Sequence, residues 1–261
     1  MKKRVISAII ALSIFIPLVI EGNILFRIGI LILGILGLRE IINIKNKKYP
    51  FLFKFCSYFL LSLFILNNSI FFNFNFIVDY KILSSLFLVF GVLFLFYKDI
   101  KLSDITFIIF FVLLIGISFN LIILFRMFNL NYFIYLFLIT MATDSYAYIA
   151  GNLIGKHKLL ESVSPKKTIE GLVIGSIFGT LISSTYYYIY INDSVNIVTL
   201  LLLTLLLTLL GQYGDLFFSK IKREFNIKDF SNIMPGHGGI LDRLDSIIFV
   251  VLGFCLFLSY L

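Results

Sequence analysis

The stretch LLLLTLLLTLLGQYGDLFFSKIKRE, residues 200–224, contains a long apolar run that ends in charged residues. A helix needs about 20 mostly apolar residues to cross the hydrocarbon core of a bilayer, and this run, with the apolar residues before it, is long enough. Asp215 stands where the run ends. Lys220, Lys222 and Arg223 follow it. The stretch therefore predicts a membrane-spanning helix with an acid and several bases at one end.

The rest of the chain repeats this apolar pattern. Hydrophobic residues make up 60% of its 261 residues, whereas a typical soluble protein is about 45–50% apolar. Lipid cannot hydrogen-bond an exposed backbone, so runs of this length predict helices. We therefore expect an all-α, polytopic integral membrane protein with about nine transmembrane helices. They fall near residues 4–20, 24–38, 51–71, 82–97, 105–125, 131–150, 169–191, 196–216 and 242–261.

The basic residues indicate the orientation of these helices. If the N-terminus is cytoplasmic, all of the 22 Lys and Arg residues except Arg27, Lys81 and Arg126 fall in cytoplasmic segments. Because cytoplasmic loops are enriched in Lys and Arg, we expect the N-terminus inside and the C-terminus outside. The net charge of +8 then belongs to one membrane face, where it suits anionic lipid. No nucleic-acid-binding motif accompanies it, so we expect no nucleic-acid partner.

Polar residues are distributed unevenly along the chain. Residues 1–130 form apolar spans with sparse loops, and we expect them to be a scaffold and a lipid-facing wall. Residues 131–261 carry two long polar loops and acids within predicted spans. We therefore expect the C-terminal transmembrane region to be catalytic, with both loops on the cytoplasmic side binding substrate.

Three of the predicted spans carry aspartates near the same membrane face. Asp144 lies inside the sixth span, where a charged side chain costs about 2.5–3.5 kcal/mol and usually faces a cavity, a partner or an ion. A structural Asp144 that is hydrogen-bonded or protonated is the alternative, and the alternative for Asp215 is an interfacial acid with no special role. Asp242 and Asp245 share one face of the last helix, where a cation would relieve their repulsion. Oxygen ligands without a thiolate cluster favour Mg²⁺ over Zn²⁺.

The segment ESVSPKKTIEG, residues 161–171, has the composition of an anion site. Ser164 and Thr168 supply hydroxyl groups, Lys166 and Lys167 supply positive charge, and a predicted helix begins directly afterwards. Backbone N–H groups and the helix dipole make such an N-terminus suitable for phosphate. The alternative is a capped helix whose lysines simply obey the positive-inside rule.

The segment PGHGGILDRLD, residues 235–245, joins a glycine-rich turn to the last pair of acids. Its glycines allow the backbone to approach a ligand closely. His237 can donate a hydrogen bond or stack, and Arg243 can contact a phosphate. Alone, this turn is a weak signal, because a loop histidine is more often a local hydrogen-bonding group than a catalyst.

The longer segment SKIKREFNIKDFSNIMPGHGGILDRLD, residues 219–245, resembles the signature of the phosphatidate cytidylyltransferase (CDP-diacylglycerol synthase) family. That signature has Ser, Lys-Arg, Lys-Asp, Pro-x-His-Gly-Gly and Asp-Arg-x-Asp at fixed spacings. It is matched at Ser219, Lys222, Arg223, Lys228, Asp229, Pro235, His237, Gly238, Gly239, Asp242, Arg243 and Asp245. Met234 stands where the family usually has Leu, Ile or Phe, a conservative departure. Residues 144–148 and 164–171 are similar to two further family segments, Asp-Ser/Thr-x-Ala-Tyr and Ser-Pro-Lys-Lys-Thr-x-Glu-Gly.

The resemblance implies an activity, cofactors and partners. The activity is transfer of CMP from CTP, or dCTP, to phosphatidate, which gives CDP-diacylglycerol and pyrophosphate. The implied cofactor is Mg²⁺, with a second, monovalent cation such as K⁺, and the implied assembly is a homodimer in the lipid bilayer. We expect a multi-pass protein of the plasma membrane whose active site faces the cytoplasm, so that the lipid tails stay in the bilayer while CTP arrives from the cytosol.

The resemblance also gives roles to individual residues. The expected metal ligands are Asp215, Asp242 and Asp245. The expected catalytic residues are these three acids together with Lys222, Arg223 and Arg243. The expected substrate-binding residues are Asp144, Ser164, Lys166, Lys167, Thr168, Glu170, Lys228, His237, Gly238 and Gly239.

Other functions remain as alternatives. One is another membrane enzyme that uses CTP, either a polyprenol kinase or an archaeal-type lipid cytidylyltransferase, and the His-Gly-Gly and Asp-Arg-x-Asp motifs disfavour the kinase. A secondary transporter belongs to a different class. Transporters place polar residues near the bilayer midplane on interrupted helices, often in repeated halves. Here the acids gather near one face and no internal repeat is evident.

Overall fold

The chain is organised as two compact units. The computed structural model describes residues 13–45, 47–67, 80–233, 236 and 238–258. The first unit combines Met1–Met127 with Phe230–Ile240, and the second combines Phe128–Asp229 with Leu241–Leu261. The second polar loop is therefore divided, because its part from Phe230 to Ile240 belongs to the first unit.

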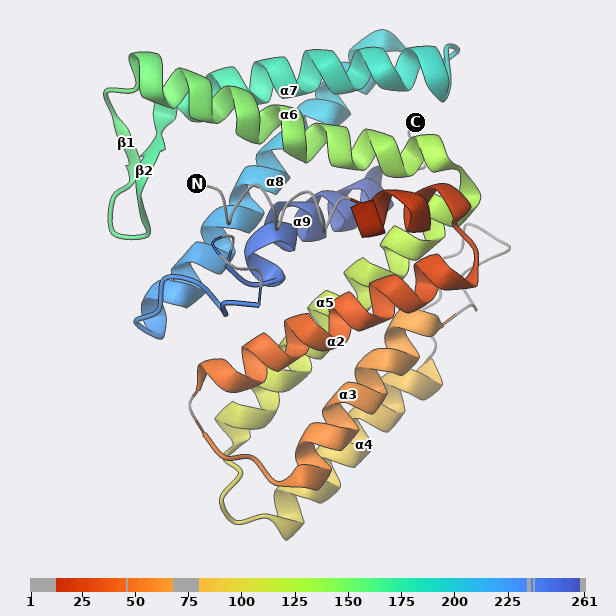
Figure 1. Cartoon of the computed structure of the whole chain (residues 1–261), viewed down its shortest axis with the longest axis vertical. Helices are drawn as coiled ribbons and strands as arrows, with labels where there is room; N and C mark the ends of the chain where they lie inside the picture. The colour runs from red at the N-terminus through yellow and green to blue at the C-terminus, as the bar shows by residue number, and fades with distance from the viewer. Residues whose placement is uncertain (1–12, 46, 68–79, 234–235, 237, 259–261) are drawn as a thin grey trace. The chain divides into compact units, whose positions relative to one another are not determined.

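The first unit is a group of apolar helices (Figure 1). In the part that the structure describes, these are α2 (Ile24–Ile44), α3 (Phe51–Leu66), α4 (Tyr80–Phe96) and α5 (Leu102–Phe128). Residues 13–21 are helical as well. Large side chains fill the interior, among them the fully buried Phe53, Phe90 and Phe119. Apolar side chains that face outward on these helices suit a lipid environment.

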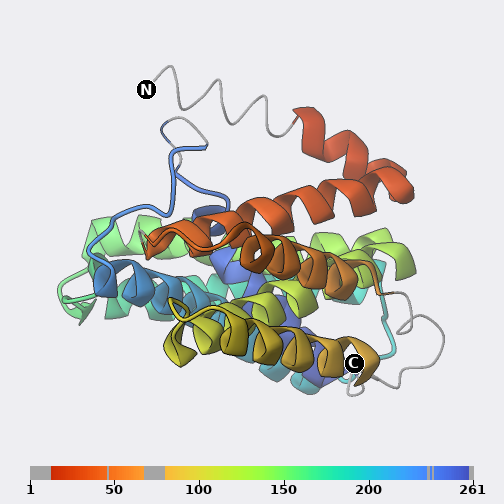
Figure 2. The same ribbon diagram turned by 90° about the horizontal axis from the view of Figure 1, so that it is seen from below.

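A tight turn joins the helix of residues 13–21 to α2 (Figure 2). Gly22 has φ of +79°, a conformation that residues with a Cβ rarely adopt. The guanidinium group of Arg126, near the end of α5, donates hydrogen bonds to the carbonyl oxygens of Val19 at 2.5 Å and Ile20 at 2.7 Å. These bonds satisfy carbonyl groups that the end of a helix leaves without intrahelical partners.

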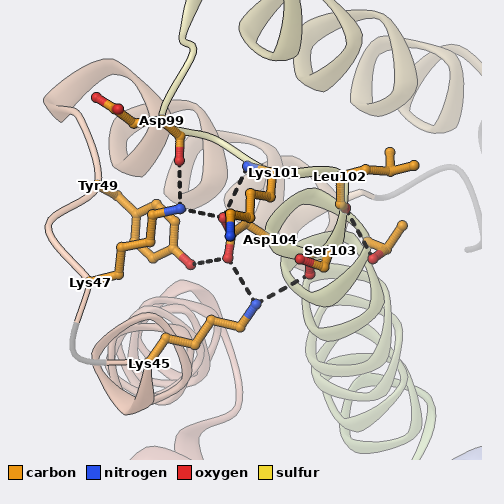
Figure 3. A network of polar contacts seen from close by, with 9 residues as sticks. Lys45, Lys47, Tyr49, Asp99, Lys101, Leu102, Ser103 and Asp104 are labelled. Atoms are coloured by element: carbon orange, nitrogen blue, oxygen red, sulfur yellow. Dashed lines mark hydrogen bonds and ion pairs between the residues drawn. The ribbon is translucent and has the colours of Figure 1, made fainter.

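A polar network ties the segment after α2 to the start of α5 (Figure 3). The carboxylate of Asp104 forms ion pairs with Nζ of Lys45 at 2.9 Å and Nζ of Lys47 at 2.5 Å. The Tyr49 hydroxyl donates to the same carboxylate at 3.0 Å, and the Lys101 backbone N–H donates at 3.1 Å. Burial and the bond to Asp104 raise the pKa of Tyr49 above its usual value, so the phenol stays protonated and remains a donor.

The second unit combines helices with a short hairpin (Figure 1). Its elements are α6 (Leu130–Ile154), β1 (Lys158–Leu160), β2 (Ser164–Thr168), α7 (Ile169–Tyr190), α8 (Ile197–Glu224) and α9 (Leu241–Phe257). The two strands pair antiparallel, with Lys158 opposite Thr168 and Leu160 opposite Ser164. This hairpin departs from the expected all-α fold. Strands of three and five residues are too short to show a reliable alternation of apolar and polar residues in the sequence.

Helices α6 and α7 lie side by side because small residues line their contact. Gly171 and Gly175 occur four residues apart and so lie on one face of α7. A Cβ at Gly171 would lie 2.8 Å from the carbonyl oxygen of Ala147, and one at Gly175 would lie 2.8 Å from that of Thr143. Small residues allow membrane helices to approach this closely. The contact holds the segment of α6 around Asp144 against α7.

The helices lie where the hydropathy pattern placed them. Each of α2 to α9 overlaps one predicted span, and the structure is nearly all-α, consistent with a membrane protein. Within the described residues, four helices are long and apolar enough to cross a membrane, namely α5, α6, α7 and α8. Nine spans, with the N-terminus inside, stay a prediction. Residues 4–12 of the first span, 68–71 of the third and 259–261 of the ninth lie outside the described residues.

Candidate active site

Two aspartates meet where α8 packs against α9. Gly214 leaves no room for a side chain, since a Cβ there would lie 2.6 Å from the carbonyl oxygen of Asp245 and 2.8 Å from the ring of Phe249. This approach brings the carboxylates of Asp215 and Asp245 within range of mutual repulsion. Asp245 is buried, and its Oδ1 accepts a hydrogen bond from the backbone N–H of Ser246 at 2.8 Å.

Asp144 adds a third carboxylate from α6. It interacts electrostatically with Asp215, with Asp245 and with Lys167 of the hairpin. Its side chain is exposed rather than packed in the interior. Carboxylates from three helices of the second unit are therefore close enough to repel one another, and positive charge would favour this arrangement.

Two lysines form ion pairs with acids of this cluster. Nζ of Lys167 lies 2.6 Å from Oδ2 of Asp215, and both side chains are partly exposed. Nζ of Lys222 lies 2.6 Å from Oδ1 of Asp242, with 10% and 6% of the two side chains exposed. Ser219 Oγ also donates to Oδ1 of Asp215 at 3.2 Å. The hairpin, α8 and α9 thus contribute alternating charges to one region of the second unit.

The hairpin residues have distinct surroundings. Thr168 is the N-cap of α7, because its Oγ1 accepts from the Gly171 backbone N–H at 3.1 Å. The capped-helix alternative therefore holds for this residue. Glu170 Oε1 lies 2.6 Å from Nδ1 of His157, an ion pair when the histidine is protonated. Lys166 is exposed on β2, and Ser164 begins that strand.

The three other basic candidates lie on exposed parts of the second unit. Arg223 Nε donates to the carbonyl oxygen of Val163, and its Nη1 donates to that of Ile227, both at 3.2 Å. The first of these bonds connects the end of α8 to the turn of the hairpin, and the second reaches the segment that follows α8. Lys228 and Arg243 are exposed.

The glycine-rich loop belongs to the first unit. Gly236 and Gly238 have φ of +80° and +89°, so the backbone adopts turns that disfavour other residues. Gly238 and Gly239 are both buried. His237 lies outside the described residues, as do Met234 and Pro235.

One positioning contact in the second unit was not predicted from the sequence. Gln212 of α8 donates through Nε2 to Ser176 Oγ at 2.8 Å and to the Leu172 carbonyl oxygen at 3.3 Å, both on α7. It lies one helical turn before Asp215 and fixes this part of α8 against α7. An amide within an otherwise apolar run was the available signal, because a polar side chain in a membrane helix usually bonds to another helix.

The chemistry of the acidic side chains fits Mg²⁺. Carboxylate oxygens are the ligands that Mg²⁺ prefers, and the ion usually takes one or two of them together with substrate phosphates. Asp215 and Asp245 approach each other, whereas Asp242 is ion-paired to Lys222. Across the described residues, no group of three or more His, Cys, Asp or Glu side chains is already arranged around a common metal position. The ligand set Asp215, Asp242 and Asp245 therefore stays a prediction.

Comparison with known proteins covers both halves of the chain. The sequence model of the cytidylyltransferase family matches residues 2–261. The chain belongs to the cytidylyltransferase family. The phosphatidate cytidylyltransferase of Staphylococcus aureus (strain COL) is 37% identical over 251 residues, which is 96% of each chain. That of Staphylococcus haemolyticus (strain JCSC1435) is 36% identical over 264 residues, again 96% of each chain. The resemblance indicated by the signature is confirmed, and it extends through the N-terminal half.

Proposed function

We propose that this protein transfers CMP from CTP to phosphatidate, giving CDP-diacylglycerol and pyrophosphate for phospholipid synthesis. Family membership supports cytidylyl transfer, and relatives named phosphatidate cytidylyltransferase support phosphatidate as the acceptor. The structural observation that carries the proposal is the cluster of acids from α6, α8 and α9 with Lys167 and Lys222 paired to two of them. Such a cluster suits a polyanionic substrate that brings its own cation.

The reaction is a displacement at phosphorus. An oxygen of the phosphatidate phosphate attacks the α-phosphorus of CTP and forms a new P–O bond. The bond from that phosphorus to the bridging oxygen breaks, and pyrophosphate leaves with the electron pair. The attacking oxygen is already anionic near neutral pH, so stabilising charge contributes more than a strong general base. The ammonium groups of Lys167 and Lys222 are the charges that the chain itself supplies beside the acids.

Mg²⁺ is part of the proposal. Asp215 of α8 and Asp242 and Asp245 of α9 would hold the ion. When bound, the ion would offset negative charge on the phosphates and on the leaving pyrophosphate. We include a second, monovalent cation such as K⁺ by analogy with the family.

We assign nucleotide binding to the hairpin and to the segment of residues 219–245, which resembles the family signature. Exposed Lys166 and the start of α7 offer positive charge and helix N–H groups to a phosphate. Arg223 and Arg243 would contribute further phosphate contacts. The remaining proposed substrate contacts are Asp144, Ser164, Thr168, Glu170, Lys228, His237, Gly238 and Gly239.

We place the site at the cytoplasmic face of the plasma membrane. The positive-inside pattern puts both polar loops in the cytoplasm, where CTP is available. An acceptor at this boundary keeps its acyl chains in the bilayer while its phosphate reaches the site. A homodimer completes the proposal by analogy with the family.

The position of a label in CTP tests the reaction. Purified protein is incubated with phosphatidate, Mg²⁺ and CTP labelled either on the α-phosphate or on the γ-phosphate. We expect the α label in CDP-diacylglycerol, the γ label in pyrophosphate, and loss of both products with EDTA until Mg²⁺ is restored. A lipid that acquires the γ label from CTP in the presence of polyprenol would instead identify a kinase. Absence of any labelled lipid would reject the enzymatic proposal.

A further inference from the structure

Glu40 is a buried acid outside the aspartate cluster. It lies near the end of α2 in the first unit, and only 2% of the residue is exposed. The second predicted span, residues 24–38, ends before Glu40, and no role was expected for it, whereas α2 continues to Ile44. A buried carboxylate in such a helix is unfavourable unless hydrogen-bond donors surround it. Its contacts therefore show what it holds.

Both ends of the glycine-rich loop bind one oxygen of Glu40. The Ser231 hydroxyl donates to Oε1 at 2.5 Å, and the backbone N–H of Ile240 donates to the same atom at 2.8 Å. Ser231 Oγ also accepts from the backbone N–H of Ile233 at 3.3 Å. The carboxylate thus brings Ser231 and Ile240 to one oxygen atom.

Gly239 also packs directly against this carboxylate. A Cβ at Gly239 would lie 2.7 Å from Cδ and 2.8 Å from Oε2 of Glu40. Real Cβ atoms do not approach other atoms so closely, so one of the two residues would have to move. The last glycine of the motif is therefore explained by Glu40 in this structure, whether or not a ligand also approaches it.

We propose that Glu40 is a positioning residue that holds Ser231 and Ile240, the two ends of the glycine-rich loop. The chain passes from Ile240 directly to Leu241, where α9 begins, and Asp242 is the next residue. Glu40 therefore holds the residue that directly precedes α9. This inference rests on the proposed cytidylyl transfer, and it gives the N-terminal half a part in the reaction.

Replacing the carboxylate tests the role through kinetics. Glu40→Ala is expected to lower kcat about 10- to 100-fold, the range typical of residues that orient metal ligands, and to raise the Mg²⁺ concentration for half-maximal activity. Glu40→Gln should recover much of this loss, because its side-chain carbonyl oxygen can still accept both bonds. Asp104→Asn is the matched control, since Asp104 is also a buried acid of the first unit. It should lower the melting temperature while leaving the Mg²⁺ dependence unchanged.

A double-mutant comparison separates positioning from general stability. Adding Ser231→Ala to Glu40→Ala should cause little further loss, because both changes remove the same contact. Losses that multiply, or a Glu40→Ala enzyme with normal kcat and normal Mg²⁺ dependence, would overturn the proposal.

Amide exchange provides a readout that does not depend on the reaction. In Glu40→Ala, the Ile240 amide should exchange with deuterium about tenfold faster than in the parent, whereas Asp104→Asn should leave it unchanged. If the parent makes no CDP-diacylglycerol but this difference appears, the proposed reaction fails while the loop contact stands. Unchanged exchange in Glu40→Ala contradicts the positioning role.

Discussion

The two units each contain a cluster of charged residues, and the clusters differ in how negative charge is balanced by positive charge. In the first unit, one carboxylate, that of Asp104, is paired with Lys45 and Lys47 and accepts a further bond from Tyr49. In the second unit, four aspartates gather, and the two ion pairs involve Asp215 and Asp242 with one lysine each. The first cluster has more cations than acids, whereas the second has more acids than paired lysines.

This difference indicates which cluster acts on a ligand. A carboxylate surrounded by donors is satisfied in place, and removing a partner mainly affects folding. Acids that repel one another across several helices are costly unless something positive joins them. The stability of the fold gives no reason to bring Asp144, Asp215 and Asp245 close together, because their carboxylates repel one another. We therefore interpret the Asp104 network as structural and the aspartate cluster as the reaction site.

The largest expected effect comes from removing an acid of the aspartate cluster. Asp215→Asn or Asp242→Asn should lower kcat on the order of 100- to 1,000-fold or more, because each removes negative charge that would hold the proposed cation. Initial rates of CDP-diacylglycerol formation over a range of Mg²⁺ concentrations measure this. Asp104→Asn is the counterpart in the other cluster and should retain near-normal turnover. An equal loss of kcat in Asp104→Asn would contradict the assignment of the reaction to the aspartate cluster.

Replacing one lysine in each cluster should have the next largest effect. Lys167→Met removes a charge placed beside Asp215 and should raise KM for CTP about 10- to 100-fold, the value of one charge-assisted hydrogen bond. Lys47→Met removes a comparable pair from Asp104 and should leave KM unchanged. Steady-state kinetics with varied CTP compare the two. A normal KM in Lys167→Met would remove this lysine from the proposed nucleotide site.

A structural feature could be predicted from the sequence when neighbouring residues in the chain determine it. The helices follow from continuous apolar runs, so α5, α6 and α7 were placed to within four residues at either end, whereas α8 continues past its predicted end at residue 216 to Glu224. The hairpin between α6 and α7 was not predicted. Its short polar strands are stabilised by pairing with each other, and such short strands show no clear alternation of apolar and polar residues in the sequence. The acids of the site could be singled out because a charge within an apolar span is itself a signal.

Long-range partners could not be predicted in the same way. Glu40 and Ile240 are 200 residues apart, and nothing near either residue indicates their contact. Likewise the pairing of Lys167 with Asp215 required the fold, although each residue was a candidate separately. Sequence patterns identify charged side chains whose burial in an apolar span is energetically unfavourable, whereas only the folded chain shows which side chains contact one another.

Helix packing gives a third, smaller contrast between the units. A Cβ at Gly179 of α7 would lie 3.2 Å from Cα and Cβ of Thr143, whereas one at Gly91 of α4 would meet nothing within 4 Å. Gly179→Leu should therefore destabilise the protein by about 1–3 kcal/mol through overpacking. Gly91→Leu is the matched control and should be tolerated. Thermal unfolding in detergent compares them, and a Gly179→Leu protein as stable as the Gly91→Leu protein would contradict the close contact.

The smallest effect is expected at the edge of the structural cluster. Tyr49→Phe removes the hydroxyl that donates to Asp104 and should lower stability by about 1 kcal/mol without changing turnover. The pKa of Tyr49 is raised by burial and by this bond, so the folded protein keeps the phenolic proton longer than the unfolded chain does.

The sign of the pH dependence follows from that difference. Below the ordinary tyrosine pKa of about 10, both states keep the proton and the advantage over Tyr49→Phe is complete. Above that pH the unfolded chain loses its proton first, so the advantage should shrink as pH rises. Melting temperatures of both proteins from pH 7 to 11 test this, because the two proteins differ only in the hydroxyl of residue 49. A difference that grows with pH would mean that Tyr49 does not donate to Asp104.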